Sequence, residues 1–127
     1  MHWFPLSKYI NALVSARKLV RQVYVDERVR EYIVNLVLAT RDPGSIKKAE
    51  LIGFIEVGAS PRASIGLSQA AKAHAFIQGR AYVTPEDVKA VAMEVMRHRL
   101  VLSYEAEAEE ISAEVVVQKI LDSVEVP

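Results

Sequence analysis

Hydrophobic residues recur at intervals of three and four along most of the chain, which is the pattern of amphipathic helices. Five such runs each predict a helix. The first ends near Gln22, the second starts after Asp26, and the third spans about 61–78. The fourth starts at Thr84, and the fifth runs to Val124. The sequence therefore predicts an all-α fold, a small bundle of about five helices. The residues at helical spacing in the first run are Leu6, Tyr9, Ile10, Leu13, Ala16 and Val20, and the core stripe of the second is Val29, Tyr32, Ile33, Leu36 and Thr40.

The second predicted helix carries a further apolar face, made of Val34, Val37 and Leu38. We therefore expect it to be buried on most sides. The third is rich in alanine, which lets neighbouring elements approach closely, and Gly79 is expected to end it. Residues 45–59 are expected to form a loop with a short helical turn around 47–52, and residues 98–110 a turn.

Two short segments with an aromatic–valine pair stand directly before helix starts. Val23-Tyr24-Val25 precedes Asp26, which is a good N-cap. Ala81-Tyr82-Val83 precedes Thr84-Pro85-Glu86-Asp87, which combines a cap, a proline and two acids in one turn. We expect the two segments to pair as very short strands and to hold two helix starts together. Coincidence is the alternative.

Composition narrows the class of protein. The 127 residues fit one domain, and 51% hydrophobic with 25% charged residues is typical of a soluble globule. Because there is no cysteine, disulfides, zinc–thiolate sites and thiol catalysis are excluded, and a reducing compartment is indicated. No apolar run is long enough to span a membrane, and residues 1–5 do not resemble a signal peptide. We expect a cytoplasmic location.

Charge is unevenly distributed although the net charge is zero. Residues 1–62 contain ten Lys or Arg against six Asp or Glu, and residues 63–127 contain six against ten. The imbalance favours an anionic ligand near the first half of the chain. The alternative is a chance distribution of solvated charges.

The segment Gly58-Ala59-Ser60-Pro61-Arg62 combines a helix start with a cation. Ser60 is expected to cap the helix, Pro61 to occupy its first position, and Gly58 to give the backbone freedom. Arginine in a first turn is unfavourable by about 0.3 to 1 kcal/mol, since it adds positive charge to the positive helix end. A phosphate would neutralise both, and the planar guanidinium matches phosphate oxygens. The alternative is that Arg62 pairs with a carboxylate of its own domain.

Several blocks of sequence resemble, in order and spacing, the C-terminal lid of MoxR-family AAA+ ATPases. The resemblance covers residues 23–127, whereas residues 1–22, an N-terminal helix, are less typical, and whether residues 1–5 are natural stays open. The blocks are Val23-Tyr24-Val25-Asp26, Tyr32-Ile33, Leu36-Val37, Ala39-Thr40-Arg41, residues 58–63, residues 79–88 and His98-Arg99.

The resemblance implies a lid that packs over ATP and magnesium held by a neighbouring core domain. Arg62 is then the sensor-2 residue, which reaches the outer phosphate from a helix start formed with Ser60 and Pro61, and the helix tilts with nucleotide state. Tyr32 and Ile33 are placed nearest the adenine, with a plain core role as the alternative. The family further implies a homo-oligomeric ring, often a hexamer. It implies chaperone-like maturation of partner proteins, alongside proteins with von Willebrand A domains.

Catalytic parts of such an ATPase are missing from this chain. No Gly-x4-Gly-Lys-Ser/Thr loop and no Walker B strand end occur, so the chain by itself should neither hydrolyse ATP nor carry a cofactor. No catalytic residue and no metal-ligand spacing is identified, since His2, His74 and His98 are far apart. His98-Arg99 is expected to cap the preceding helix, and the acidic cluster at 105–110 to be a solvated turn.

Two other functions are compatible with a helical domain. One is a stand-alone protein-interaction module that binds no nucleotide. The other is a nucleic-acid-binding domain, which zero net charge and an acidic second half disfavour. Whether the chain self-associates stays open, because an apolar face normally covered by a core domain would be exposed.

Overall fold

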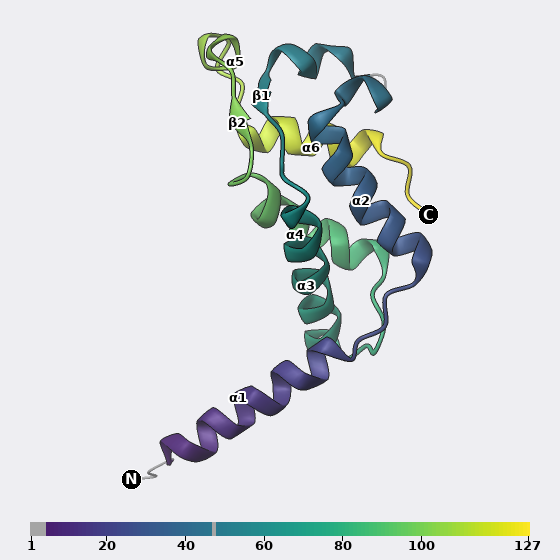
Figure 1. Cartoon of the computed structure of the whole chain (residues 1–127), viewed down its shortest axis with the longest axis vertical. Helices are drawn as coiled ribbons and strands as arrows, with labels where there is room; N and C mark the ends of the chain where they lie inside the picture. Colours follow the sequence, from purple (N-terminus) through teal and green to yellow (C-terminus); the bar gives the residue numbers. More distant parts are fainter. Residues whose placement is uncertain (1–4, 47) are drawn as a thin grey trace.

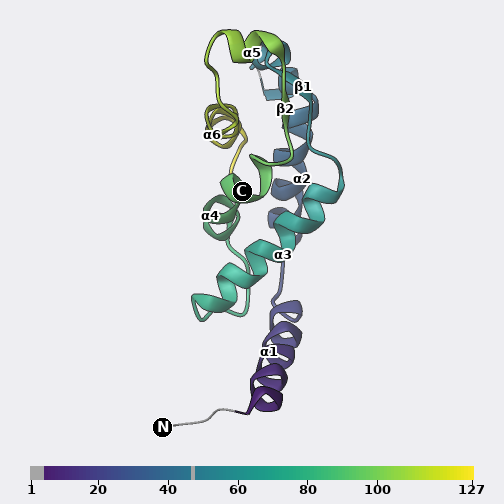
Figure 2. The same ribbon diagram turned by 90° about the vertical axis from the view of Figure 1, so that its left-hand side faces the viewer.

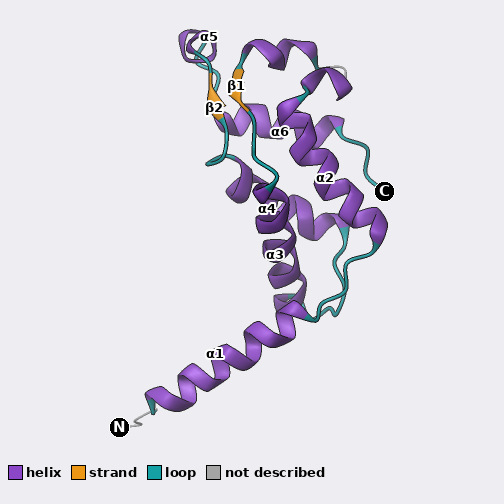
Figure 3. Ribbon diagram, in the orientation of Figure 1, coloured by secondary structure: helices purple, strands orange, loops and turns teal. Residues whose placement is uncertain are grey.

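The computed structural model describes residues 5–46 and 48–127. That part of the chain contains six α-helices, where the sequence predicted about five, joined by short 3-10 helices and two short strands (Figures 1 and 3). The α-helices are α1 (Leu6–Arg21), α2 (Glu27–Arg41), α3 (Arg62–Ile77), α4 (Pro85–Met96), α5 (Tyr104–Ala108) and α6 (Ala113–Ser123). The remaining elements are η1 (Pro43–Ile46), η2 (Ala49–Gly53), β1 (Ile55–Val57) and β2 (Val101–Leu102).

The predicted caps are confirmed at the starts of α2 and α4, and the predicted glycine follows the end of α3. The Asp26 side chain accepts a hydrogen bond from the Arg28 N–H at 3.3 Å. Thr84 and Asp87 form a reciprocal capping box at the start of α4. α3 ends at Ile77 and is followed by Gly79, whose φ of 80° is left-handed, and the Arg80 N–H returns to the Ala75 carbonyl at 2.9 Å.

The two tyrosine segments pair, as predicted, through one isolated parallel bridge between Tyr24 and Tyr82. The Tyr24 N–H donates to the Ala81 carbonyl at 2.8 Å, and the Val83 N–H donates to the Tyr24 carbonyl at 2.9 Å. The bridge ties the segment that enters α2 to the segment that enters α4. Two helix starts are thereby held side by side.

Two segments expected to be loop and turn contain regular structure instead. β1 and β2 form an antiparallel pair with an irregular register, Ile55 opposite Leu102 and Val57 opposite Val101. Ser103 extends the contact, since its hydroxyl donates to the Gly53 carbonyl at 2.6 Å and also caps α5. Strands of two and three residues are too short to show an alternating pattern, and their pairing joins positions about 45 residues apart.

The hydrophobic core lies between α2, α3, α4 and α6 (Figure 1). Alanines of α3 are buried against α4, which confirms that small residues allow close packing here. The expectation that α2 is buried on most sides is wrong. Val37 is buried, but Val34 is 41% and Leu38 51% exposed, because no described element covers that side. The buried side chains of α2 are Val29, Tyr32, Ile33, Leu36, Val37, Ala39 and Thr40.

α1 projects away from the bundle, at the end of the molecule opposite α5 (Figures 1 and 2). It has no buried residue along its whole length. Its C-terminal end contacts α3, whereas Leu6, Ile10 and Leu13 are each about half exposed or more.

Glycine-to-alanine substitutions inside α3 and just after its end are expected to change stability in opposite directions. Gly79→Ala should cost about 1 kcal/mol, because its left-handed φ of 80° disfavours any Cβ although nothing lies within 4 Å. Gly66→Ala should add about 0.5 to 1 kcal/mol, because Gly66 lies inside a helix and an added Cβ meets its nearest neighbour at an ordinary 3.4 Å. Urea denaturation of both variants measures the two changes in unfolding free energy. Changes of the same sign would contradict the expectation.

Candidate functional site

Arg62 is the first residue of α3 and its side chain is exposed. Across residues 5–46 and 48–127, it makes no hydrogen bond or ion pair. α3 contains no carboxylate, and its N-terminal turn has no acidic residue to balance the helix dipole. The alternative that Arg62 pairs with a carboxylate of its own domain is therefore not observed among these residues.

The loop before Arg62 is fixed to the end of α2 by a buried threonine. The Thr40 hydroxyl donates to the Val37 carbonyl at 2.6 Å and accepts from the Ala59 N–H at 2.9 Å. Gly58 lies so close to α2 that a Cβ there would be 2.6 Å from the Thr40 carbonyl oxygen. Gly58 is thus required for close approach and not for a left-handed backbone, since its φ is not positive.

Ser60 and Pro61 directly precede Arg62, but the prediction that the Ser60 side chain caps α3 is wrong. α3 begins at Arg62, one residue later than expected, and Pro61 already has helical angles of φ −55° and ψ −24°. Ser60 offers its carbonyl to the Ala63 N–H at 2.9 Å, while no side-chain capping bond forms at this helix start. The N–H groups of this turn are consequently left without a side-chain cap.

Tyr32 and Ile33 both lie in the core, which is the alternative that the sequence left open. The buried Tyr32 hydroxyl has no hydrogen-bond partner in the described structure, and burial, followed by the charge of Glu86, raises its pKa. Ile33 additionally lines a surface depression of about 300 Å³ between α2 and α3. The other lining residues are Arg30, Val34, Ser64, Ile65, Ser68, Gln69 and Lys72.

Arg99 is a second cation of this region that sequence reasoning missed. It was expected to cap α4 with His98, but no side-chain bond from either residue to an α4 carbonyl is formed in the described part of the chain. A Cβ added to Gly66 would instead lie 3.4 Å from Arg99 Nη2, so the guanidinium rests against α3. Gly66 is one helical turn from Arg62 and on the same face. The glycine at position 66, which leaves room for a neighbouring side chain, was the sequence signal that could have indicated this contact.

A buried ionic cluster joins the end of α3 to the start of α4, and sequence reasoning missed it as well. Asp87 is fully buried. Its Oδ1 is paired with the Arg80 guanidinium and lies 2.7 Å from His74 Nδ1. Its Oδ2 accepts from the Thr84 N–H at 2.8 Å and from the Thr84 hydroxyl at 3.0 Å. The two helices are therefore joined where the chain turns between them.

Burial by itself would raise the pKa of the Asp87 carboxyl group. The hydrogen bonds from Thr84 and His74, together with the charge of Arg80, outweigh that effect and hold the pKa below its ordinary value of 3.8. The ionised form is therefore the one that stabilises the fold.

Acid is expected to remove this contribution selectively. A carboxyl group whose pKa is lowered by folding stabilises the protein above its unfolded pKa, and the contribution is lost as pH falls through the folded pKa. The difference in unfolding free energy between the wild type and Asp87→Asn should therefore shrink from its value at pH 5 once the pH drops below about 4. Urea titrations at pH 5, 4 and 3 measure it. A difference that grows on acidification would contradict the assignment.

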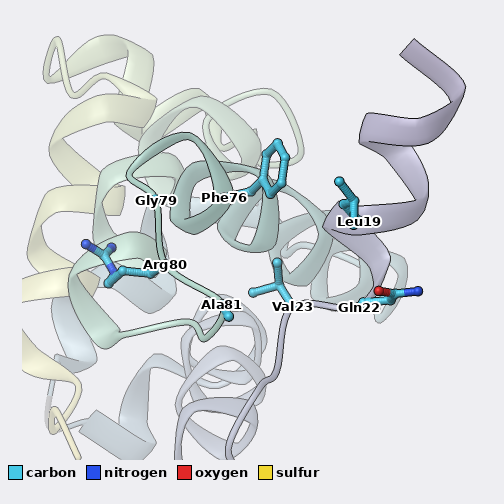
Figure 4. A pocket seen from close by; sticks show the side chains of 7 residues that line it. All are labelled: Leu19, Gln22, Val23, Phe76, Gly79, Arg80 and Ala81. Atoms are coloured by element: carbon cyan, nitrogen blue, oxygen red, sulfur yellow. The ribbon is translucent and has the colours of Figure 1, made fainter. Parts of the chain in front are cut away.

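A separate apolar pocket of about 360 Å³ lies at the base of α1 (Figure 4). Leu19 borders it from α1 and Phe76 from the C-terminal end of α3. Because a 16-residue helix is about 24 Å long, this pocket and Arg62 lie at opposite ends of α3. The pocket is thus not part of the Arg62 site. No cluster of His, Cys, Asp or Glu suited to a metal ion occurs among the described residues.

Comparison with known proteins identifies the class. The family described as AAA lid domain matches residues 53–120, a stretch that includes Arg62, the Asp87 cluster and Arg99. The chain therefore belongs to the AAA lid domain family.

The relatives specify which kind of lid it is. Chaperone MoxR1 of Mycobacterium tuberculosis is 40% identical over 115 residues, which are 91% of this chain and 30% of that protein. Uncharacterized protein YeaC of Bacillus subtilis is 39% identical over 85% of this chain and 31% of its own length. A solved structure of a putative ATPase from Cytophaga hutchinsonii superposes with a TM-score of 0.90 at 41% identity, covering 92% of this chain and 36% of that one.

This lid is of the MoxR type of AAA+ ATPase, and the chain spans about a third of the length of the relatives it matches. Within the described residues, no helix has the length and apolar character that a membrane crossing requires.

Proposed function

We propose that this domain senses the outer phosphate of ATP through Arg62 and converts nucleotide state into a tilt of α3. The observation that carries the proposal is an exposed arginine at an uncapped helix start, without a carboxylate partner in the described structure. Such a cation adds to the positive end of the helix and is unfavourable until an anion arrives. A phosphate relieves both charges at once.

The surroundings of Arg62 support this role. Arg99 rests against Gly66, one turn along α3 from Arg62, and no carboxylate of the described residues pairs with either arginine. The tight packing of Gly58 and the Thr40–Ala59 hydrogen bond fix the loop that presents Arg62. A small rotation of α3 about its C-terminal end would move Arg62 most, because Arg62 is the residue of the helix furthest from that end.

The nucleotide-holding and hydrolytic parts of the proposed ATPase lie outside this chain. ATP and magnesium would be held by the core domain of the same polypeptide, and hydrolysis would take place there. The depression lined by Ile33 and Ile65 is the surface we assign to the side facing the adenine, with Tyr32 supporting it from the core. We further propose a cytoplasmic ring of identical subunits, possessing a chaperone-like action on partner proteins that include von Willebrand A domain proteins.

The test is the ATP hydrolysis of an intact ATPase whose lid is this domain, with and without Arg62. Loss of activity in Arg62→Ala supports the sensor, and an unchanged rate and affinity for ATP overturns it. A stand-alone interaction module predicts no effect of nucleotide at all.

A further inference from the structure

β1 and β2 form a small sheet whose two faces differ. Leu102 lies opposite Ile55, and both are partly buried against the core. Val101 lies opposite Val57. Because successive side chains of a strand point to opposite faces, this second pair stands on the outer face of the sheet. Val57 is 55% and Val101 50% exposed, so the outer face is apolar and open to solvent.

The chain next to this sheet adds two further exposed apolar side chains, since Ile52 is 57% and Tyr104 84% exposed. Both lie at the same end of the sheet. The Ser103 N–H donates to the Phe54 carbonyl at 2.9 Å, and the Ser103 hydroxyl donates to the Gly53 carbonyl at 2.6 Å. Together with α5, this region forms the end of the molecule opposite α1 (Figures 1 and 2). We define the tip surface as Ile52, Val57, Val101 and Tyr104.

The charged residues around the tip surface are all acidic. Residues 50–57 and 101–111 contain no lysine, arginine or histidine. Their glutamates are exposed and form no ion pair in the described part of the chain. The Glu105 carboxylate lies against the sheet, since a Cβ added to Gly53 would be 3.4 Å from its Oε2. The glutamates are Glu50, Glu56, Glu105, Glu107, Glu109 and Glu110.

An apolar face with an acidic border indicates the chemistry of its occupant. Exposed apolar patches with a polar rim mark sites of contact with other proteins. A border of unpaired carboxylates favours a partner that brings lysine or arginine, because complementary charges steer the encounter and disfavour other partners. Two copies of the tip surface would place glutamate against glutamate, so a symmetric contact between them does not fit. The occupant that fits is a protein segment with an aliphatic centre and cationic flanks.

We propose that the tip surface is a docking site for such a segment of another protein, apolar in its centre and flanked by lysine or arginine. The aliphatic centre would cover the outer valine pair, and the cations would pair with the glutamates of α5 and its neighbours. The inference goes beyond nucleotide sensing and does not depend on Arg62. It gives the domain a surface for partner proteins at the end away from α1.

Amide chemical shifts of the 127-residue chain test the proposal. The probe is a synthetic peptide of valines flanked by lysines. One control peptide has glutamate flanks and the other has a serine centre. The lysine–valine peptide is expected to shift the amides of residues 50–57 and 101–110 most. Both control peptides should bind about tenfold more weakly, because one reverses the charge complementarity and the other removes the apolar contact.

Three variants connect the binding to the tip surface. Glu107→Lys combined with Glu109→Lys reverses two exposed charges of the border and should weaken binding of the lysine–valine peptide about tenfold. Val101→Ser removes one member of the outer valine pair and should weaken it about threefold. Glu31→Lys makes the same charge change at an exposed position of α2 and should alter affinity less than about twofold. Thermal unfolding confirms that each variant remains folded.

Several results would overturn the proposal. One is that the largest shifts lie outside residues 50–57 and 101–110. Another is equal binding of the lysine-flanked and glutamate-flanked peptides, which would leave the acidic border without a role. A third is a shift of the tip amides that grows with the concentration of the chain alone. That result would make a second copy the occupant, through a basic surface such as α1, whose charged residues are all lysine or arginine.

Discussion

In an intact ATPase that contains this lid, Arg62→Ala is expected to lower kcat/KM for ATP about ten- to a hundredfold. A hydrogen bond to a charged group contributes about 1.5 to 3 kcal/mol, and each 1.4 kcal/mol is a factor of ten. The arginine makes no hydrogen bond or ion pair in the described chain and stands at the positive helix end, so its removal should not lower the stability of the lid and should raise it by at most about 1 kcal/mol. Steady-state kinetics with ATP, and thermal unfolding of the same variant, measure both expectations.

Three further substitutions make the Arg62 result specific. Arg62→Lys keeps the charge but loses the planar fork, and should retain part of the activity. Lys72→Ala removes another cation of α3 about 15 Å along the helix and should have little effect. Arg99→Ala should cost less than Arg62→Ala, because Arg99 reaches α3 one turn further from its start. Equal losses in Arg62→Ala and Lys72→Ala would indicate a general loss of positive charge and refute a sensor at Arg62.

Asp87→Ala is expected to destabilise the isolated chain by about 3 kcal/mol, the lower end of the range for breaking a buried ion pair. The carboxylate is fully buried, and its removal leaves Arg80 and His74 without their partner and opens the capping box of α4. The lower end applies because both cations remain about one third exposed to water. Urea denaturation of the purified chain measures the loss.

The neighbouring residue provides the matched control for Asp87. Glu86 lies in the same turn of α4 and makes only an exposed contact of 3.8 Å with Lys89. Glu86→Ala should therefore change stability by less than about 0.5 kcal/mol. Asp87→Asn keeps the shape of the side chain and should fall between the two. Similar losses for Glu86→Ala and Asp87→Ala would mean that helix-end charge, and not the buried cluster, stabilises α4.

Helix positions could be predicted because the signals that set them are local. The cap at Asp26, the capping box at Thr84 and the left-handed Gly79 each involve residues within a few positions of one another. The pairing of the tyrosine segments was predictable because both carry the same pattern before a helix start. Arg62 could be singled out because a cation in the first turn of a helix adds to the positive helix end, and neighbouring residues alone reveal this.

What the sequence by itself determined is the all-α fold, the approximate positions of α1, α2, α3, α4 and α6, and the position of Arg62 at the start of α3. The tertiary structure alone decided which faces of α2 are buried, that β1 pairs with β2, and that Arg99 lies against Gly66. It also gathered His74, Arg80 and Asp87 into one cluster. The physical reason is distance along the chain. Capping and periodicity act between near neighbours, whereas burial and ion pairing depend on which remote segments the folded backbone brings together.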